Sequence, residues 1–405
     1  MRLLASLFFL VSALSVHADN PTYPLHYLIT LNPEQDRAEV VIESDHKGLL
    51  KQLDFNIGSG RYSNLDANGT LVIENDRAVW TPPERNARFT LQVALSHQRD
   101  PGEYDALMTD DWTIFRGDDV IPPARVRTVS GAQSEAQLTF VLPEHWTSVS
   151  TGWRKLDERS FAIEDPERRF SRPTGWMIAG LLGTRRDRLG NTEVVVGAPK
   201  DSGLRRMDVL TFMAVVWPHM QVAFGETPSN LAIVGHGKPM WRGGLSASNS
   251  LFLHADRPLV SENGTSSLVH ELVHIVTRVY GKPGHDWIAE GLAEFYAFEL
   301  LHRAGAMTDR RRQRVLASLA DWSQEVDSLI KPSSSGPTTA RAVLVFEALD
   351  RELRAATNGQ YNLDHLVRRL MVLRKVSLGD LRRLAEDLAG RPLKTLQEPV
   401  LDSEP

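Results

Sequence analysis

The organisation of this 405-residue chain follows from one segment, Leu268-Val-His-Glu-Leu-Val-His-Ile-Val276, and from the Asp286-Trp-Ile-Ala-Glu-Gly-Leu-Ala-Glu-Phe-Tyr296 run shortly after it. Residues four apart lie on one face of a helix, so His270 and His274 can present imidazole nitrogens to the same cation. Glu271 lies one step round the helix and can point toward a water bound to that cation. We therefore predict a zinc ion held by both histidines, with Glu271 as general base and then general acid.

The residues around the two histidines are apolar on nearly every side, which predicts a helix buried in a core. Gly281, Pro283 and Gly284 end this helix, and a second helical run begins near Asp286. A helix, a tight connection and an antiparallel helix bring Glu290 back toward the histidines. The third ligand is then a carboxylate, and one coordination position stays open for water or substrate.

His270-Glu271-x-x-His274 followed by Trp287-x-x-Glu290-Gly291-x-Ala293 resembles the gluzincin metallopeptidases, the clan of thermolysin, aminopeptidase N and the glycyl aminopeptidases. The resemblance implies that Glu290 is the third zinc ligand, although only 15 residues separate it from His274, fewer than is usual in the clan. Glu294, at the separation seen in thermolysin-like enzymes, is the alternative ligand. We expect Glu294 to lie behind the ligands and orient a histidine.

The segment Trp241-Arg-Gly-Gly-Leu-Ser-Ala-Ser-Asn-Ser-Leu-Phe-Leu253 precedes the predicted zinc helix by about the distance at which the family places its substrate-binding edge strand. An extended peptide can add to such a strand through backbone hydrogen bonds. The glycyl aminopeptidases have Gly-Gly-Leu-Glu-His there, and their Glu grips the free amine of the substrate. This chain has Ser246 and Ala247 in place of Glu and His, and a serine cannot supply that charge. The mode, endopeptidase or aminopeptidase, therefore stays open, and the substrate-binding residues we expect are Gly243, Gly244, Leu245, Ser246 and Asn249.

The family also has a tyrosine that donates to the oxyanion in the transition state. In our register this position falls on Thr338 or Thr339, before a helix that contains Leu344-Val-x-x-x-Leu-Asp350. Loss of an oxyanion donor typically lowers the rate about 100- to 1000-fold. The candidates to replace it are Tyr280, Tyr296, Tyr361 and Arg341.

Residues 1–18 have the features of a secretory signal peptide: one positive charge, an apolar run too short to span a membrane, and Val16 and Ala18 before the cleavage point. We expect a periplasmic or secreted protein with no membrane span after cleavage. The chain has no cysteine, so it depends on its core rather than on disulfides. Its formal net charge of −5 and the lack of a long basic run argue against a nucleic-acid partner.

The fold class that we predict is α+β in three parts after the signal peptide. Short β-rich runs broken by turns indicate an all-β sandwich over residues 19–150. A mixed run of strands and helices over residues 151–305 fits a thermolysin-like zinc metallopeptidase domain. Residues 306–405 have helical periodicity, including one helix expected over 310–330, and form a C-terminal helical region.

The leading hypothesis from the sequence is an exported zinc-dependent metallopeptidase that acts on peptide or protein substrates. The alternative is a catalytically weak or inactive zinc-binding homologue that binds peptide or a protein partner, and the serine at 246 and the missing tyrosine favour it. Retention of Glu271 argues against this alternative, because a purely structural zinc needs no base beside it. A zinc hydrolase that acts on cell-wall peptide cannot be separated from the leading hypothesis, and the sequence gives no oligomeric state.

Overall fold

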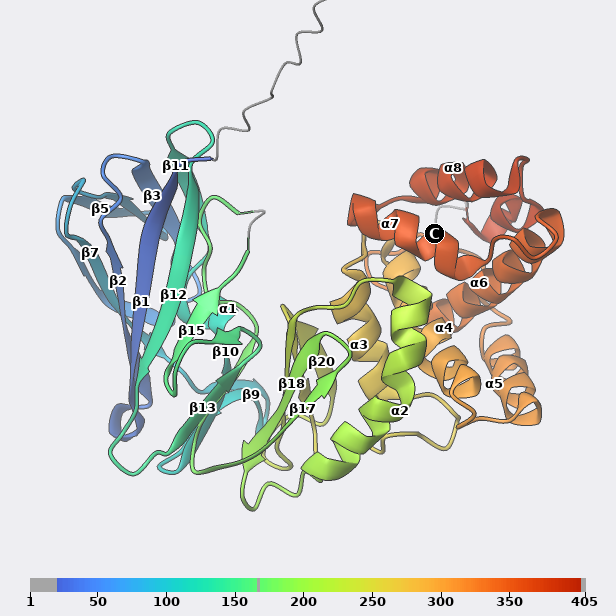
Figure 1. Ribbon diagram of the computed structural model, residues 1–405, viewed down its shortest axis with the longest axis horizontal. Coiled ribbons are helices and arrows are strands. Elements are labelled where there is room, and N and C mark those ends of the chain that lie inside the picture. The colour runs from blue at the N-terminus through green and yellow to red at the C-terminus, as the bar shows by residue number, and fades with distance from the viewer. Residues whose placement is uncertain (1–19, 166–167, 402–405) are drawn as a thin grey trace, which may run out of the picture.

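A computed structural model describes residues 20–165 and 168–401, and its fold class is α+β. The first half of the chain is built almost entirely of strands, and the second half packs helices against a further five-stranded sheet (Figure 1). The signal peptide predicted at residues 1–18 lies outside the described residues.

Two sheets of the N-terminal half face each other across a common core. The seven-stranded sheet has the order β14 (Arg154–Lys155), β15 (Ser160–Ile163), β12 (Gln133–Val141), β1 (Thr22–Asn32), β2 (Arg37–Ser44), β7 (Ala87–Ala94) and β4 (Tyr62–Ala67). The four-stranded sheet has the order β11 (Ala124–Thr128), β3 (Leu50–Asn56), β6 (Arg77–Thr81) and β5 (Thr70–Glu74). Alternate residues of β1 are buried, as expected for a strand with one face on a core. Phe55 of β3 meets Phe89 of β7 with ring centroids 4.8 Å apart, so the two sheets form a sandwich.

A third sheet, not expected from the sequence, connects the sandwich to the rest of the molecule (Figure 1). Its order is β13 (Ser148–Thr151), β16 (Trp176–Gly180), β10 (Trp112–Arg116), β9 (Glu103–Met108) and β8 (His97–Asp100), and the short helix α1 (Gly117–Val120) follows β10. Because β14 and β15 belong to the first sheet and β16 to the third, the β-rich half extends to Gly180. The boundary predicted at residue 150 falls inside it.

The second half begins with a five-stranded sheet of order β17 (Leu182–Leu189), β18 (Thr192–Pro199), β19 (Asn230–Val234), β21 (Ser250–Leu253) and β20 (Gly244–Ala247). Strand β20 is therefore an edge strand, antiparallel to β21. The helix α2 (Arg206–Phe224) packs on this sheet through buried residues that include Met213 and Trp217. In the described part of the chain, α2 is the one helix long and apolar enough to cross a membrane, and here it is a core helix.

Two helices then form a hairpin, α3 (Ser267–Thr277) and α4 (Asp286–Arg303). The Ser266 hydroxyl caps α3 by accepting a hydrogen bond from the backbone N–H of Val269. Arg278 ends the helix in the left-handed conformation, with φ 49°. The chain then turns back within a few residues to begin α4. The glycines and proline at residues 281–284 predict this turn.

The remaining helices are α5 (Asp309–Trp322), α6 (Pro337–Ala356), α7 (Leu363–Leu373) and α8 (Leu378–Ala389), followed by 3₁₀ turns at Lys394–Gln397 and Pro399–Leu401. The single helix expected over 310–330 ends at Trp322. One continuous core joins these helices to α2, α3, α4 and the five-stranded sheet. The division predicted at residue 305 therefore does not separate two cores, because the apolar faces of the C-terminal helices have no other surface to cover.

Gly291 of α4 lies where α4 and α6 pack closely against each other. A Cβ atom on Gly291 would lie 2.6 Å from the Cβ of Ala342 and 2.9 Å from the ring of Phe346. The Trp287 ring, one turn earlier, packs beside the same phenylalanine at 5.8 Å between centroids. The glycine of the Trp-x-x-Glu-Gly motif thus serves helix packing.

We expect Gly291→Ala to lower the free energy of unfolding by about 1–3 kcal/mol, because the added methyl group overlaps α6. Chemical denaturation of the purified protein measures this. Gly379→Ala in α8 is the matched control, since a Cβ there meets nothing closer than 3.8 Å, and it should leave stability unchanged or slightly raised. Equal stability of both variants would contradict the close-packing explanation.

Candidate metal centre

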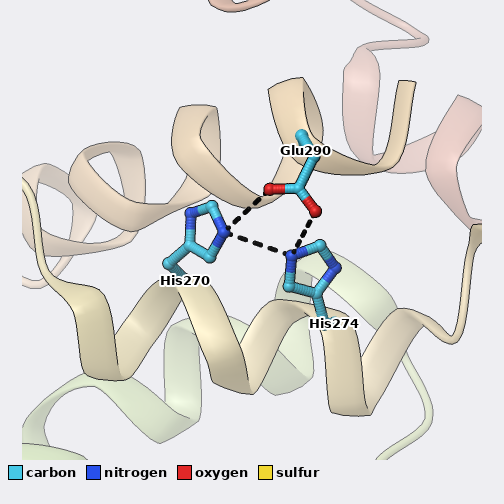
Figure 2. Close-up of side chains that lie close together, drawn as sticks. All are labelled: His270, His274 and Glu290. Atoms are coloured by element: carbon cyan, nitrogen blue, oxygen red, sulfur yellow. Dashed lines mark hydrogen bonds and ion pairs between the residues drawn. The ribbon is translucent and has the colours of Figure 1, made fainter. Parts of the chain in front are cut away.

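Three side chains from α3 and α4 converge on one point. His270 and His274 project from adjacent turns of α3, and Glu290 reaches toward them from α4 (Figure 2). The two Nε2 atoms lie 3.1 Å apart, and the Glu290 oxygens lie 3.3 Å and 3.4 Å from His270 Nε2 and His274 Nε2. The structure therefore brings together the three ligands expected from the sequence.

These separations fit a tetrahedral metal ion. Four ligand atoms about 2.0–2.1 Å from a tetrahedral zinc lie about 3.3 Å from one another. In addition, two neutral imidazoles cannot bond through two Nε2 atoms that both act as acceptors, whereas both lone pairs can point at one cation. The residues present thus fit zinc, with two nitrogens and one carboxylate as its ligands.

Glu294 lies behind His270 rather than beside the three ligand atoms. Its Oε2 is 3.0 Å from His270 Nδ1, on the side of the ring away from Glu290. A carboxylate there fixes the tautomer of the imidazole so that Nε2 carries the free lone pair. Glu294 thus lies where a partner that orients His270 would lie, whereas Glu290 lies near the Nε2 atoms of both histidines.

The charges of the site are strongly coupled. Burial would lower the pKa of His270, but its hydrogen bonds to Glu290 and Glu294 raise that pKa to about 10. Burial likewise opposes ionisation of Glu290, yet the two histidines hold the pKa of its carboxyl well below the usual range. The carboxylates thus favour a positive charge at this point, and a divalent cation would supply one.

Glu271 joins the metal ligands to the edge strand β20. Its Oε2 accepts a hydrogen bond of 2.8 Å from the backbone N–H of Ser246. A Cβ atom on Gly244 would lie 3.2 Å from Glu271 Cγ, so the strand passes directly beside this side chain. The arrangement holds the carboxylate next to the three ligands and next to the backbone that a peptide could pair with.

The register of β20 shows which backbone groups face outward. Leu245 pairs with Phe252, and the Gly243 carbonyl accepts from the N–H of His254. Because outward and inward groups alternate in an antiparallel pair, the backbone of Gly244 and Ser246 points away from β21. Leu245, Ser246 and Asn249 line the cleft described below, whereas Gly243, expected among the substrate-binding residues, packs its Cα against the Trp241 ring.

The N-terminal half supports this edge strand, which the sequence did not reveal. Trp176 donates from its backbone N–H to Ser250 Oγ at 2.7 Å and from Nε1 to the Leu245 carbonyl at 2.8 Å. Gly152 and Gly175 let the β20–β21 turn approach, since Cβ atoms there would lie 2.1 Å and 2.4 Å from backbone oxygens of that turn. The sequence signal that could have indicated this contact is the Gly175-Trp176 pair at the start of the apolar strand β16.

A cleft with a volume of about 1010 Å³ opens between the two halves and contains His270, Glu271, His274 and Glu290 in its wall. Its other side includes Trp153, Arg116 of β10 and Asp118 of α1. This space is large enough for several residues of an extended peptide.

The residues considered as oxyanion donors lie in different places. Tyr280 lines the cleft and is 56% exposed. Tyr296 is buried and donates to Asp364 at 2.7 Å, and Arg341 donates to Glu398 at 2.8 Å. Tyr361 packs against the helical core, and Thr338 and Thr339 are buried at the start of α6. Of these residues, only Tyr280 is placed to meet a ligand in the cleft.

Comparison with known proteins identifies the fold. No protein-family model matches the chain, and no curated protein sequence matches it. Among solved structures, an aminopeptidase N family protein of Idiomarina loihiensis is similar over 86% of this chain and 70% of its own, with a TM-score of 0.63 and 15% identity.

An M1 zinc metallopeptidase of Deinococcus radiodurans, in a mutant form bound to a Tyr-Ser-Ala substrate, is similar over 96% of this chain and 95% of its own, with a TM-score of 0.57 and 16% identity. A two-domain M1 zinc metallopeptidase mutant bound to L-arginine covers 95% of this chain and 94% of its own, with a TM-score of 0.59 and 15% identity. The chain therefore has the fold of the M1 zinc metallopeptidases, as its resemblance to the gluzincins predicted.

We expect purified protein to hold one zinc ion per chain, and Glu294→Ala to weaken zinc binding about 10- to 100-fold because His270 loses its orienting partner. Competition with a chromogenic chelator measures the affinity. Glu294→Gln should lose less zinc affinity than Glu294→Ala, since an amide oxygen can still accept a hydrogen bond from His270 Nδ1–H.

Glu262→Ala, a change of an exposed loop carboxylate, is the control and should bind zinc like the unmodified chain. An affinity unchanged in Glu294→Ala would remove Glu294 from the metal centre.

Proposed function

We propose that this protein is a zinc-dependent metallopeptidase that hydrolyses peptide bonds in the cleft between its two halves. The observation that carries the proposal is the position of Glu271, which is held by the Ser246 N–H at 2.8 Å, beside two histidines and a carboxylate at metal-ligand separation. A fold shared with M1 zinc metallopeptidases supports it.

In this proposal His270, His274 and Glu290 hold the metal. Zinc in such a site lowers the pKa of a coordinated water toward about 7 and polarises a substrate carbonyl. Glu271 accepts the proton of the attacking water on its carboxylate and then passes it to the leaving amine. The outward backbone of Gly244 and the Ser246 carbonyl align the peptide by strand addition, while the Ser246 N–H holds Glu271.

The choice between endopeptidase and aminopeptidase depends on what meets the free amine. At Ser246 the strand offers no carboxylate, so an ammonium gains no ion pair at this position. We therefore propose that residue 246 does not require the substrate to have a free N-terminal amine. Cleavage of peptides with blocked and with free amines tests this directly.

A second function is favoured by the same serine and by the loss of the tyrosine. A protein with this cleft and metal centre but a slow chemical step would act by binding peptide or a protein partner. The unmodified chain would then hold zinc and bind peptides without turnover, which separates this function from the first.

We expect Glu271→Gln to retain zinc but to lower kcat about 10²- to 10⁴-fold, because the amide cannot take the proton. Hydrolysis of an internally quenched peptide library, together with metal content, measures both. Glu262→Gln serves as the control variant. Peptide cleavage that persists undiminished in Glu271→Gln would sink the assignment of this carboxylate as the base.

Export is a further proposal, which rests on the features of residues 1–18. Expression of the full chain in a Gram-negative host should yield a periplasmic protein whose N-terminus is Asp19, measured by mass spectrometry of the purified product. A cytoplasmic product that keeps Met1 would contradict it.

A further inference from the structure

The cleft contains arginine and lysine side chains that differ in their partners. Arg116 and Arg168 lie near carboxylates, at 3.5 Å from Asp118 and 3.0 Å from Asp165 respectively. In contrast, no carboxylate of the described residues lies within 4.0 Å of the side-chain nitrogens of Arg278 or Lys375, although both line the same cleft.

Arg278 is fixed close to the metal centre. It follows His274 by four residues at the end of α3, and both residues line the cleft. Its Nη2 donates to the side-chain oxygen of Asn249 at 2.7 Å, in the turn between β20 and β21. Asn249 is neutral, so this contact holds the guanidinium in place without balancing its charge.

Lys375 reaches the same wall from a distant part of the chain. Strand β22 (Tyr280–Gly281) pairs in parallel with β23 (Lys375–Val376), and Tyr280 lies opposite Lys375. The backbone N–H of Tyr280 donates to the Arg374 carbonyl at 2.7 Å. This pairing carries positive charge from the end of α7 to the cleft wall beside Arg278.

The Arg278 guanidinium and the Lys375 ammonium have no carboxylate partner among the described residues, so they repel a divalent cation bound nearby. An anionic group of a ligand that lies between these positive charges and the cation removes this repulsion. A guanidinium forms a planar fork that matches a carboxylate, and such charge-assisted bonds are stronger than neutral ones. The part of the cleft wall formed by Arg278 and Lys375 is therefore suited to a carboxylate.

We propose that Arg278, assisted by Lys375, forms a carboxylate-binding subsite that makes this protein selective for peptides with an acidic group near the cleaved bond. Residues four apart on a helix lie about 5–6 Å from each other. Because an extended chain advances about 3.3–3.6 Å per residue, the acidic group lies within about two residues of that bond. The group is either an Asp or Glu side chain or a C-terminal carboxylate. This inference rests on the proposed function.

The test uses pairs of peptides that are identical except for Glu or Gln at one position, scanned over two residues on each side of the cleaved bond. A further pair ends in a free carboxylate or in an amide. The measurement is the ratio of kcat/KM within each pair for the zinc-loaded full chain. We expect a ratio of at least about tenfold for one pair, which corresponds to about 1.4 kcal/mol. If a Glu/Gln pair shows this ratio, the subsite binds an acidic side chain. If the pair that differs at its C-terminus shows it, the subsite binds a terminal carboxylate.

Two variants remove the charge in different ways. Arg278→Met deletes the guanidinium, and Asn249→Asp keeps the size of the turn residue but gives Arg278 a carboxylate partner of its own. Both should lower the ratio to within about threefold of one, because a charge-assisted bond supplies the selectivity. Arg205→Met is the matched control, an exposed arginine at the start of α2 that pairs with Asp208, and it should keep the ratio.

A ratio within twofold for every pair in the unmodified chain would overturn the subsite, and so would a ratio that survives in Arg278→Met. An equal fall in kcat/KM for both members of a pair in Arg278→Met would also overturn it, since Arg278 would then act in the transition state for all substrates.

If no peptide is cleaved, the proposed function fails, and the inference is decided by binding. Calorimetric titration of the zinc-loaded chain with the same pairs should then show tighter binding of the carboxylate member, about tenfold, that is lost in Arg278→Met. Equal affinity within each pair, or binding of none of them, would overturn the inference.

Discussion

Two imidazole nitrogens and one carboxylate meet at one point between α3 and α4, and the packing around these two helices holds them there. The Nε2 atoms of His270 and His274 lie 3.1 Å apart, a distance that only a shared proton or a cation makes favourable. Placing Glu290 beside both nitrogens requires α3 and α4 to pack together, and α4 in turn packs closely on α6, where a Cβ on Gly291 would lie 2.6 Å from the Cβ of Ala342. The C-terminal helices are therefore part of the metal centre's support, and this explains why they share one core with the five-stranded sheet.

The N-terminal half holds the edge strand β20 in position in a similar way. An edge strand leaves backbone groups free, and their position is poorly fixed without a second layer behind them. Here the third sheet supplies that layer, since Trp176 bonds to both β20 and β21 and two glycines let the intervening turn dock closely. The strand, Glu271 and the ligands form one rigid group because Ser246 connects the strand to the carboxylate.

The fold of an M1 zinc metallopeptidase is present here at 15–16% identity to the solved structures, so the architecture tolerates extensive substitution. One difference from the glycyl aminopeptidases lies at the cleft wall. Serine stands at 246 where those proteins have a glutamate, and Arg278 lies in the same wall beside the candidate metal centre. A guanidinium without a carboxylate partner favours anionic over cationic groups on a ligand. The proposed selectivity thus rests on residues other than the predicted metal ligands and Glu271.

Short-range patterns in the sequence were enough to predict the helical spacing of His270 and His274, the return of Glu290 after a glycine-rich turn, and the alternation of the N-terminal strands. These follow from fixed periods of helix and strand, which a single segment reveals. The third sheet, the shared core beyond residue 305, and the placement of Arg278 and Lys375 in one cleft wall became visible in the folded chain alone. Each of these joins residues far apart in the chain, and no local period encodes which distant surfaces will meet. The sequence also could not show that Tyr296 is unavailable as an oxyanion donor. Its hydroxyl is buried and donates to Asp364, a contact that depends on how α4 and α7 pack.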